Sequence, residues 1–172
     1  MIEVGNRSIK ERRRSTSVKI APGGVVADYV PWYFATRSPM MFAIDRGNVP
    51  EYHGGCGPLV YLVSTVEDLQ RHGCRLVFTD RNAVHDYAAH GADVDAVEID
   101  WSLMRAKMWN NTSNEPDRME RRMAECLAHR SVPWEAIQLV ATKSEPIAAR
   151  VRNAIDAADH QPDVRVQPDW YF

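Results

Sequence analysis

A run of aromatic residues followed by an arginine and a Ser-Pro pair is the segment of this sequence best suited to chemistry. Residues 28–41 read DYVPWYFATRSPMM. Pro31 indicates an edge strand or a strand end, because proline removes a hydrogen bond from a central ladder. Ser38 and Pro39 fit the N-cap and first position of a helix. Aromatic faces beside a helix N-terminus and a cation suit base stacking and phosphate binding. From chemistry alone, a buried aromatic strand end is the favoured interpretation.

Composition indicates a globular chain with one strongly basic segment. The 172 residues are 45% hydrophobic and 26% charged, with a formal net charge of −2, which is enough for one domain with a core. Residues 1–20 hold six Lys or Arg against two Glu, a local charge of +4. Such a segment fits a salt-sensitive contact with a polyanion. The alternative is an ordinary solvated helix face.

Cysteine and histidine spacing predicts neither disulfides nor a metal site. The three cysteines lack a CxxC pair, and the six histidines lack the spacing of metal ligands. There is no apolar run of membrane-spanning length and no apolar signal region, so we predict no membrane association and a cytoplasmic location.

Apolar runs, caps and turn residues predict a mixture of strands and short helices. Strands are expected over residues 25–34, 59–63, 75–78, 125–128, 137–141 and 163–166. Helices are expected over residues 40–44, from a capping box at 64–67 to Gly73, from Asp100 to Trp109, from Pro116 to Arg122, and over 145–158. Because helices do not alternate regularly with strands, the pattern favours one α+β domain over a doubly wound parallel sheet.

The aromatic segment resembles the signature of the DarT family, toxins that ADP-ribosylate single-stranded DNA on the base. Family members carry a DYVPFYF-x-x-RSPM-like run, in which Trp32 here replaces the second aromatic. Other similar pieces occur in the same order: KERRR at 10–14, PGG at 22–24, VFTDR at 77–81, AECL at 124–127 and DWYF at 169–172. The resemblance therefore runs from about Ser8 to Phe172.

This resemblance implies both a fold and an activity. The fold would be a single ADP-ribosyltransferase-like domain over residues 1–172, a split antiparallel sheet with flanking helices that holds NAD between its halves. The activity would be transfer of ADP-ribose from NAD, the co-substrate, to a base, thymidine, of single-stranded DNA. The protein would be the toxin of a toxin–antitoxin pair, and its partner an antitoxin with an ADP-ribosyl-hydrolysing macrodomain. No metal is implied.

The same resemblance assigns catalysis to Arg13 and Glu125. Glu125 matches the family's catalytic glutamate, and a carboxylate there would stabilise an oxocarbenium-like transition state. Arg13 matches an essential arginine that would hold NAD and position the deprotonated acceptor base, since arginine stays protonated. Because Arg12 and Arg14 are adjacent to Arg13, the match to the family's essential arginine leaves an error of one residue open. From residue type alone, Glu125 would be a surface glutamate on an edge strand.

DNA binding is implied for a set of cationic, aromatic and helix-entry residues. Arg and Lys would bind phosphates, Trp109 would stack on a base, and Tyr33 would pack against the target base. Core packing is the alternative for Met40 and Trp109, and solvation is the alternative for the two consecutive arginines at 121 and 122. The resemblance also implies that the long loop from Asp80 to Glu125 recognises the acceptor. Asp80 and Arg81, which open this loop, would equally suit a structural ion pair that braces it. The full set is Tyr33, Arg37, Ser38, Pro39, Met40, Lys107, Trp109, Arg121 and Arg122.

One departure from the family concerns the N-terminus. Family members begin with a strand and helix whose His-x-Thr pair grips NAD, and this sequence has no His-x-Thr. A start upstream is the first expectation. A truncated, catalytically inactive remnant that still binds single-stranded DNA is the alternative, and a shortened site with weaker NAD affinity is the third. A nuclease is disfavoured, because no carboxylate cluster suggests a metal site.

Overall fold

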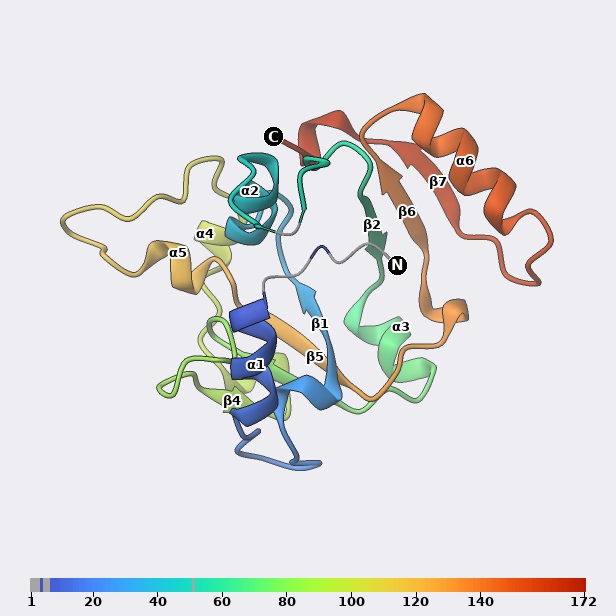
Figure 1. Ribbon diagram of the computed structural model, residues 1–172. Helices are drawn as coiled ribbons and strands as arrows, with labels where there is room; N and C mark the ends of the chain where they lie inside the picture. Colours follow the sequence, from blue (N-terminus) through green and yellow to red (C-terminus); the bar gives the residue numbers. More distant parts are fainter. Residues whose placement is uncertain (1–3, 5–6, 51) are drawn as a thin grey trace. The chain divides into compact units, whose positions relative to one another are not determined.

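The computed structural model describes Val4 and residues 7–50 and 52–172. Its helices and strands form two compact units (Figure 1). One unit comprises Met1–Val4, Met40–Gly73 and Val132–Phe172, and the other comprises Gly5–Pro39 and Cys74–Ser131. The single domain over residues 1–172 stays a prediction.

The unit that holds Arg13 and Glu125 is built on a four-stranded antiparallel sheet of order β1-β5-β3-β4. β1 lies at the edge, and its Pro31 faces Leu127 of β5, which confirms the edge position predicted from the proline. β5 and β3 are buried and supply the core residues Val77, Phe78 and Leu127. The strands are β1 (Tyr29–Tyr33), β3 (Leu76–Thr79), β4 (His90–Gly91) and β5 (Glu125–His129).

Short helices surround this sheet. Helix α1 has no buried residue among those described and carries three arginines in its last turn. The helical elements of the unit are α1 (Arg7–Ser15), η1 (Val26–Asp28), η2 (Val94–Ala96), α4 (Trp101–Arg105) and α5 (Arg118–Arg121).

The other unit contains a three-stranded sheet of order β2-β6-β7. β2 and β6 are antiparallel, whereas β6 and β7 are parallel because helix α6 makes the crossover between them. β7 covers residues 163–166 at the sheet edge, as predicted. The elements are α2 (Pro39–Asp45), β2 (Val60–Val63), α3 (Val66–Arg71), η3 (Trp134–Ala136), β6 (Leu139–Thr142), α6 (Glu145–Ile155), β7 (Asp163–Val166) and η4 (Pro168–Trp170).

Helix boundaries account for most differences from the sequence predictions. The cap of α3 is Thr65 rather than Ser64, because the Thr65 hydroxyl accepts a hydrogen bond from Asp68 N–H at 3.1 Å. Asp100 caps α4 as predicted, but the helix ends at Arg105 instead of Trp109. α5 has only four residues. The pattern did not predict α1, β4 or η2.

The cap of α3 gives a test of this local structure. We expect Thr65→Ala to lower the free energy of unfolding by about 1 kcal/mol, because an N–H of the first helical turn loses its acceptor. Thr65→Ser keeps the hydroxyl and serves as the matched control. Urea unfolding followed by circular dichroism measures the difference, and equal losses for Ala and Ser would show that the hydroxyl does not cap the helix.

Candidate active site

Glu125 occupies the first position of β5, between two neighbouring strands. It pairs in register with Tyr33 of β1 and Thr79 of β3. Its backbone N–H donates to the Thr79 hydroxyl at 3.3 Å, and its side chain is fully buried. The predicted strand start is confirmed, but the surface position that residue type alone suggested for Glu125 is wrong.

Two donors from distant parts of the sequence hold the Glu125 carboxylate. Arg13 Nη1 lies 3.1 Å from Oε1 and 3.5 Å from Oε2. Ala83 N–H, in the segment after β3, donates to Oε2 at 3.0 Å. The structure therefore brings together the two side chains to which the resemblance assigned catalysis. It adds a backbone donor that no side-chain pattern in the sequence could have revealed.

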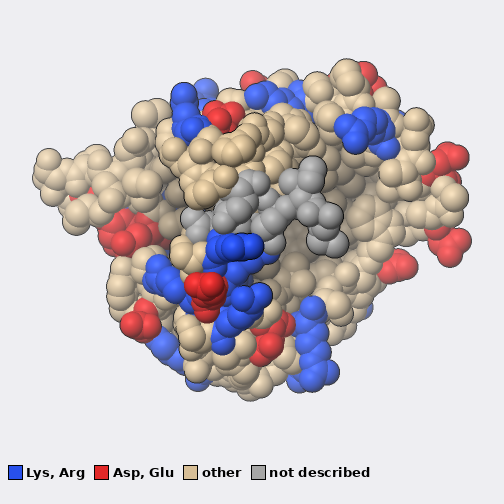
Figure 2. Space-filling view, viewed as in Figure 1, with Lys and Arg blue, Asp and Glu red and all other residues tan. Residues whose placement is uncertain are grey.

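The three consecutive arginines of α1 make different contacts. Arg12 donates from Nη2 to the carbonyl of Val84 at 3.2 Å, Arg13 reaches Glu125, and Arg14 is exposed. Basic side chains gather over α1 on the face shown in Figure 2. Their exposure agrees with the solvated helix face that the sequence left open.

Burial shifts the pKa values of the ionisable side chains at this site. It raises the pKa of Glu125 above its usual value, while the Arg13 charge and the Ala83 N–H act in the opposite direction. Burial, followed by the nearby Glu125 charge, raises the pKa of Tyr33, so its phenol stays protonated. Arg13 Nη2 is buried and has no hydrogen-bond partner among the described residues. The site therefore holds an anion, its counter-cation and one unused donor.

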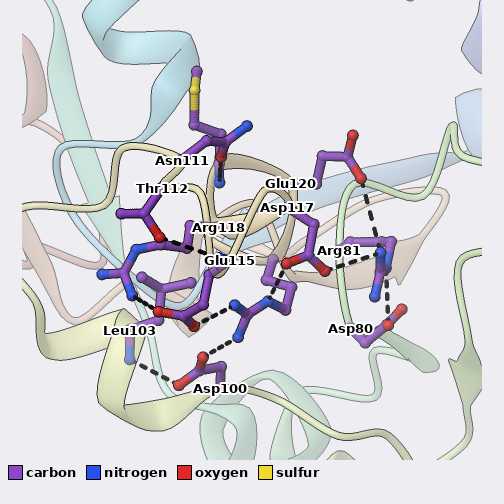
Figure 3. Close-up of polar contacts among 12 residues, drawn as sticks. Asp80, Arg81, Asp100, Leu103, Asn111, Thr112, Glu115, Asp117, Arg118 and Glu120 are labelled. Carbon is purple, nitrogen blue, oxygen red and sulfur yellow. Dashed lines mark hydrogen bonds and ion pairs between the residues drawn. The ribbon is translucent and has the colours of Figure 1, made fainter.

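The long segment between β3 and β5 is braced by ion pairs, as Figure 3 shows. The predicted pair of Asp80 and Arg81 is present, with 2.9 Å between Arg81 Nε and Asp80 Oδ2. Arg81 Nη1 also lies 3.8 Å from carboxylate oxygens of Asp117 and Glu120. The Arg81 guanidinium covers the ring of Tyr87, whose hydroxyl donates to Glu120 at 2.6 Å. These contacts join both ends of the segment.

Arg121 is a second centre of the same network, to which it is linked through Asp117. It donates to Glu115 at 2.8 Å and to Asp117 at 3.1 Å, and it also pairs with Asp100. Its side chain is 22% exposed. Because three carboxylates share its charge, Arg121 is not simply solvated and is not an open phosphate contact in this structure.

Arg122 differs more from the sequence prediction, because it is 4% exposed. Its guanidinium donates to the carbonyls of Met104 at 2.9 Å, Ala106 at 3.2 Å and Thr36 at 2.7 Å, and also to Leu103. These bonds satisfy carbonyls at the C-terminal end of α4, which have no partner within the helix. The solvated alternative is wrong for Arg122.

The other residues to which DNA binding was assigned lie in different settings. Lys107 is exposed, and Met40, at the start of α2, is 44% exposed. Trp109 is 6% exposed, so its ring is covered and core packing describes it. Arg37 is half-buried with φ +52°, and Tyr33 and Pro39 are also half-buried, whereas Ser38 is buried.

Two further searches concern the described residues only. Among them, no group of three or more His, Cys, Asp or Glu side chains could hold a metal ion. None of the helices they form is both long and apolar enough to cross a membrane.

Solved structures place this fold in a known enzyme class. The chain matches a structure of Thermus sp. 2.9 DarT in complex with ADP-ribosylated single-stranded DNA, with a TM-score of 0.91 and 32% identity over 99% of this chain and 81% of that chain. It matches the same protein in complex with NAD⁺ with a TM-score of 0.86, over 94% and 81% of the two chains. The α+β fold is therefore that of an ADP-ribosyltransferase, as predicted.

Sequence relatives then identify the family. The family model described as ssDNA thymidine ADP-ribosyltransferase, DarT, matches residues 1–172. A DNA ADP-ribosyl transferase of Thermus sp. strain 2.9 is 35% identical over 95% of this chain and 78% of its own length. One from Mycobacterium tuberculosis is 31% identical over 99% and 76%. This chain belongs to the DarT family and is a DNA ADP-ribosyltransferase.

The contrast between the consecutive arginines 121 and 122 can be tested by stability. We expect Arg122→Ala to lower the free energy of unfolding by about 3 kcal/mol, because several buried carbonyls lose their donor. Arg121→Ala should cost less than about 1 kcal/mol, because its ion pairs are partly solvated. Urea unfolding of both variants measures this, and similar losses would contradict the different roles.

Acidification tests the Arg121 network. Burial raises the pKa of Asp100, but hydrogen bonds from Ser102 and Leu103 N–H and the charge of Arg121 outweigh it and hold the pKa below its usual value. Hydrogen bonds from Arg121 and Arg118 lower the pKa of Glu115. A lowered carboxyl pKa adds stability that is present above the unfolded pKa of about 4 and is lost as pH falls through the folded pKa.

The Arg121→Gln variant should therefore melt about 1–3 °C below the unchanged protein at pH 6. This gap should close on acidification below pH 4, as Asp100 and Glu115 become protonated. Melting curves across this pH range measure the gap, and a gap independent of pH would exclude the carboxylates as its cause.

Proposed function

We propose that this chain transfers ADP-ribose from NAD to the thymidine base of single-stranded DNA and releases nicotinamide. The observation that carries the proposal is the buried Glu125 carboxylate, ion-paired with Arg13 and fixed by Ala83 N–H. The NAD⁺ and ADP-ribosylated DNA complexes of Thermus DarT support both substrates. The family description supports thymidine.

The role of Glu125 follows from the bond that breaks. Nicotinamide leaves as a neutral ring, so positive charge develops on the ribose in an oxocarbenium-like transition state. A carboxylate in a buried, preorganised position stabilises that charge more than the same group would in water. Glu125 must be ionised for this, and Arg13 favours the ionised form.

Arg13 acts as a positioning cation rather than as a base. It stays protonated at ordinary pH, so it cannot remove the proton of the acceptor nitrogen. Its Nη2, which has no hydrogen-bond partner within the described part of the chain, can instead donate to an oxygen of NAD or of the acceptor base. The acceptor nitrogen releases its proton to solvent, and the guanidinium stabilises the negative charge left on the base until the nitrogen bonds to the ribose carbon and nicotinamide has left.

The acceptor side of the site is assigned to two groups of residues. Exposed or half-buried side chains supply the proposed DNA contacts, and these are Tyr33, Arg37, Pro39, Met40 and Lys107, with Ser38 at the entry of α2. Arg121, Arg122 and Trp109 are proposed to position the segment between β3 and β5, because their charges or faces are taken up within the protein.

The biological setting rests on the family resemblance. From that resemblance, the chain is proposed to be the toxin of a toxin–antitoxin pair in the cytoplasm. The proposed antitoxin partner carries a macrodomain that hydrolyses the ADP-ribosyl group from DNA.

Intact mass of an oligonucleotide tests the reaction. Incubation of a mixed-sequence single-stranded oligonucleotide with NAD and this chain should add the mass of one ADP-ribose, and an oligonucleotide without thymidine should not gain it. Glu125→Gln should reduce the rate at least about 100-fold while leaving DNA binding nearly intact, because the neutral isostere cannot stabilise the ribose cation. Glu98→Gln, an exposed glutamate of the same unit, is the matched control.

The outcomes separate the proposal from its alternative. Full activity of Glu125→Gln would overturn the assignment of Glu125. No mass gain with the unchanged chain, together with retained binding of the oligonucleotide, would favour the catalytically inactive DNA-binding remnant.

A further inference from the structure

Basic side chains meet at the end of β5 opposite to Glu125. His129 is the last residue of β5, and its N–H donates to the carbonyl of Arg75 at 2.9 Å. Arg75 Nη2 lies 2.8 Å from His129 Nδ1, and Arg130 follows directly in sequence. Two basic residues therefore face each other across neighbouring chain segments. Such a pair lowers stability when both carry charge.

The backbone at Arg130 is a second costly feature at the same place. Its φ is +69°, a left-handed conformation that residues other than glycine seldom adopt. Its N–H donates to the carbonyl of Asp28 at 2.7 Å, which fixes the conformation. Strain of this kind persists only where the surroundings enforce it, and it is concentrated at functional sites.

The hydrogen bonding of the cluster favours an anionic ligand. Arginine only donates, so Nδ1 of His129 is the acceptor and Nε2 carries the proton. Burial lowers the pKa of His129, the charges of Arg75 and Arg130 lower it further, and the charge of Asp28 opposes them. The Asp28 carboxylate already accepts from Val25 N–H at 2.9 Å. Arg75 and Arg130 are exposed.

We propose that Arg75, His129 and Arg130 bind a backbone phosphate of the DNA acceptor, away from the modified base. A phosphate would pair with the charges of the two arginines and accept from both guanidinium groups and from Nε2–H. The choice of DNA as the source of this phosphate rests on the proposed function. The three residues are called the β5-end cluster below.

The position of the β5-end cluster fits a strand of DNA that extends from the reaction centre. Alternate residues of a strand share a face, so His129 and Glu125 lie on the same face of β5, about 13 Å apart at about 3.3 Å per residue. Phosphates of one DNA strand are spaced about 3.4 Å apart in a helix and further apart when extended. The phosphate concerned is therefore about two to four nucleotides from the target base.

Oligonucleotide length gives the test. The variant Arg75→Gln/Arg130→Gln should bind a single-stranded oligonucleotide of about sixteen nucleotides about tenfold more weakly at low salt, and its salt slope should fall by about one to two units. Binding and modification of an oligonucleotide of about four nucleotides, centred on one thymidine, should be unchanged, because it does not reach the cluster. Fluorescence anisotropy measures binding.

A matched variant controls for net charge. Arg150→Gln/Arg165→Gln also removes two exposed arginines, from the other unit, and should leave binding at both lengths unchanged. The melting temperature of Arg75→Gln/Arg130→Gln should change little, because both side chains are exposed and their contacts are solvated. A lower melting temperature, together with an equal loss of binding for the short and the longer oligonucleotide, would mean that the two arginines have a structural role and would overturn the proposal.

Two other results would also overturn it. Unchanged binding of the longer oligonucleotide would mean that no DNA phosphate binds the cluster. Inorganic phosphate is compared with chloride at equal ionic strength. If phosphate bound the cluster but did not weaken binding of the longer oligonucleotide, the ligand would be a free anion. The length dependence of binding can be measured even if the chain transfers no ADP-ribose, so this proposal and the proposed function can fail separately.

Discussion

The buried ion pair between Arg13 and Glu125 is the interaction around which the rest of this unit is arranged. A buried carboxylate is costly unless a counter-charge and hydrogen bonds compensate it. Here the counter-charge comes from α1 and a hydrogen bond from Ala83 N–H after β3. Both can reach Glu125 only while β5 keeps its register, because a one-residue slip would turn the carboxylate to the other face of the sheet.

A second buried arginine has a comparable role at the other end of the segment that joins β3 to β5. Arg122 donates hydrogen bonds to a carbonyl of α4, to the carbonyl of Ala106 directly after α4, and to that of Thr36 near the end of β1. The segment is thus fixed near its start by Glu125 and Thr79, and near its end by Arg122. Between these points its charges pair mostly with one another, through Arg81 and Arg121. The proposed acceptor-binding segment is therefore held at both ends, as a site that must present a base in one orientation requires.

Sequence reasoning succeeded where local patterns decide the structure. The apolar run after Glu125 predicted β5, Pro31 indicated an edge strand or a strand end, and the adjacent charges of Asp80 and Arg81 offered an ion pair as one of two alternatives. It failed where distant segments decide. Whether Arg122 is solvated or buried depends on carbonyls up to 86 residues away. The same bonds stabilise the end of α4 at Arg105. A backbone donor such as Ala83 N–H cannot be identified from residue types.

The ion pair that stabilises the resting site also limits what Glu125 can do. A carboxylate that is paired with a guanidinium stabilises a developing ribose cation less strongly. The guanidinium is also a second cation nearby, and it raises the energy of the transition state in which the ribose cation develops. The conflict is resolved if Arg13 turns towards a new anion when substrates bind, either the diphosphate of NAD or the base as it loses its proton. Its Nη2, for which residues 7–50 and 52–172 offer no hydrogen-bond partner, is the group that such an anion would engage first. On this argument, substrate binding and the release of Glu125 for catalysis are one event, and Arg13 couples them.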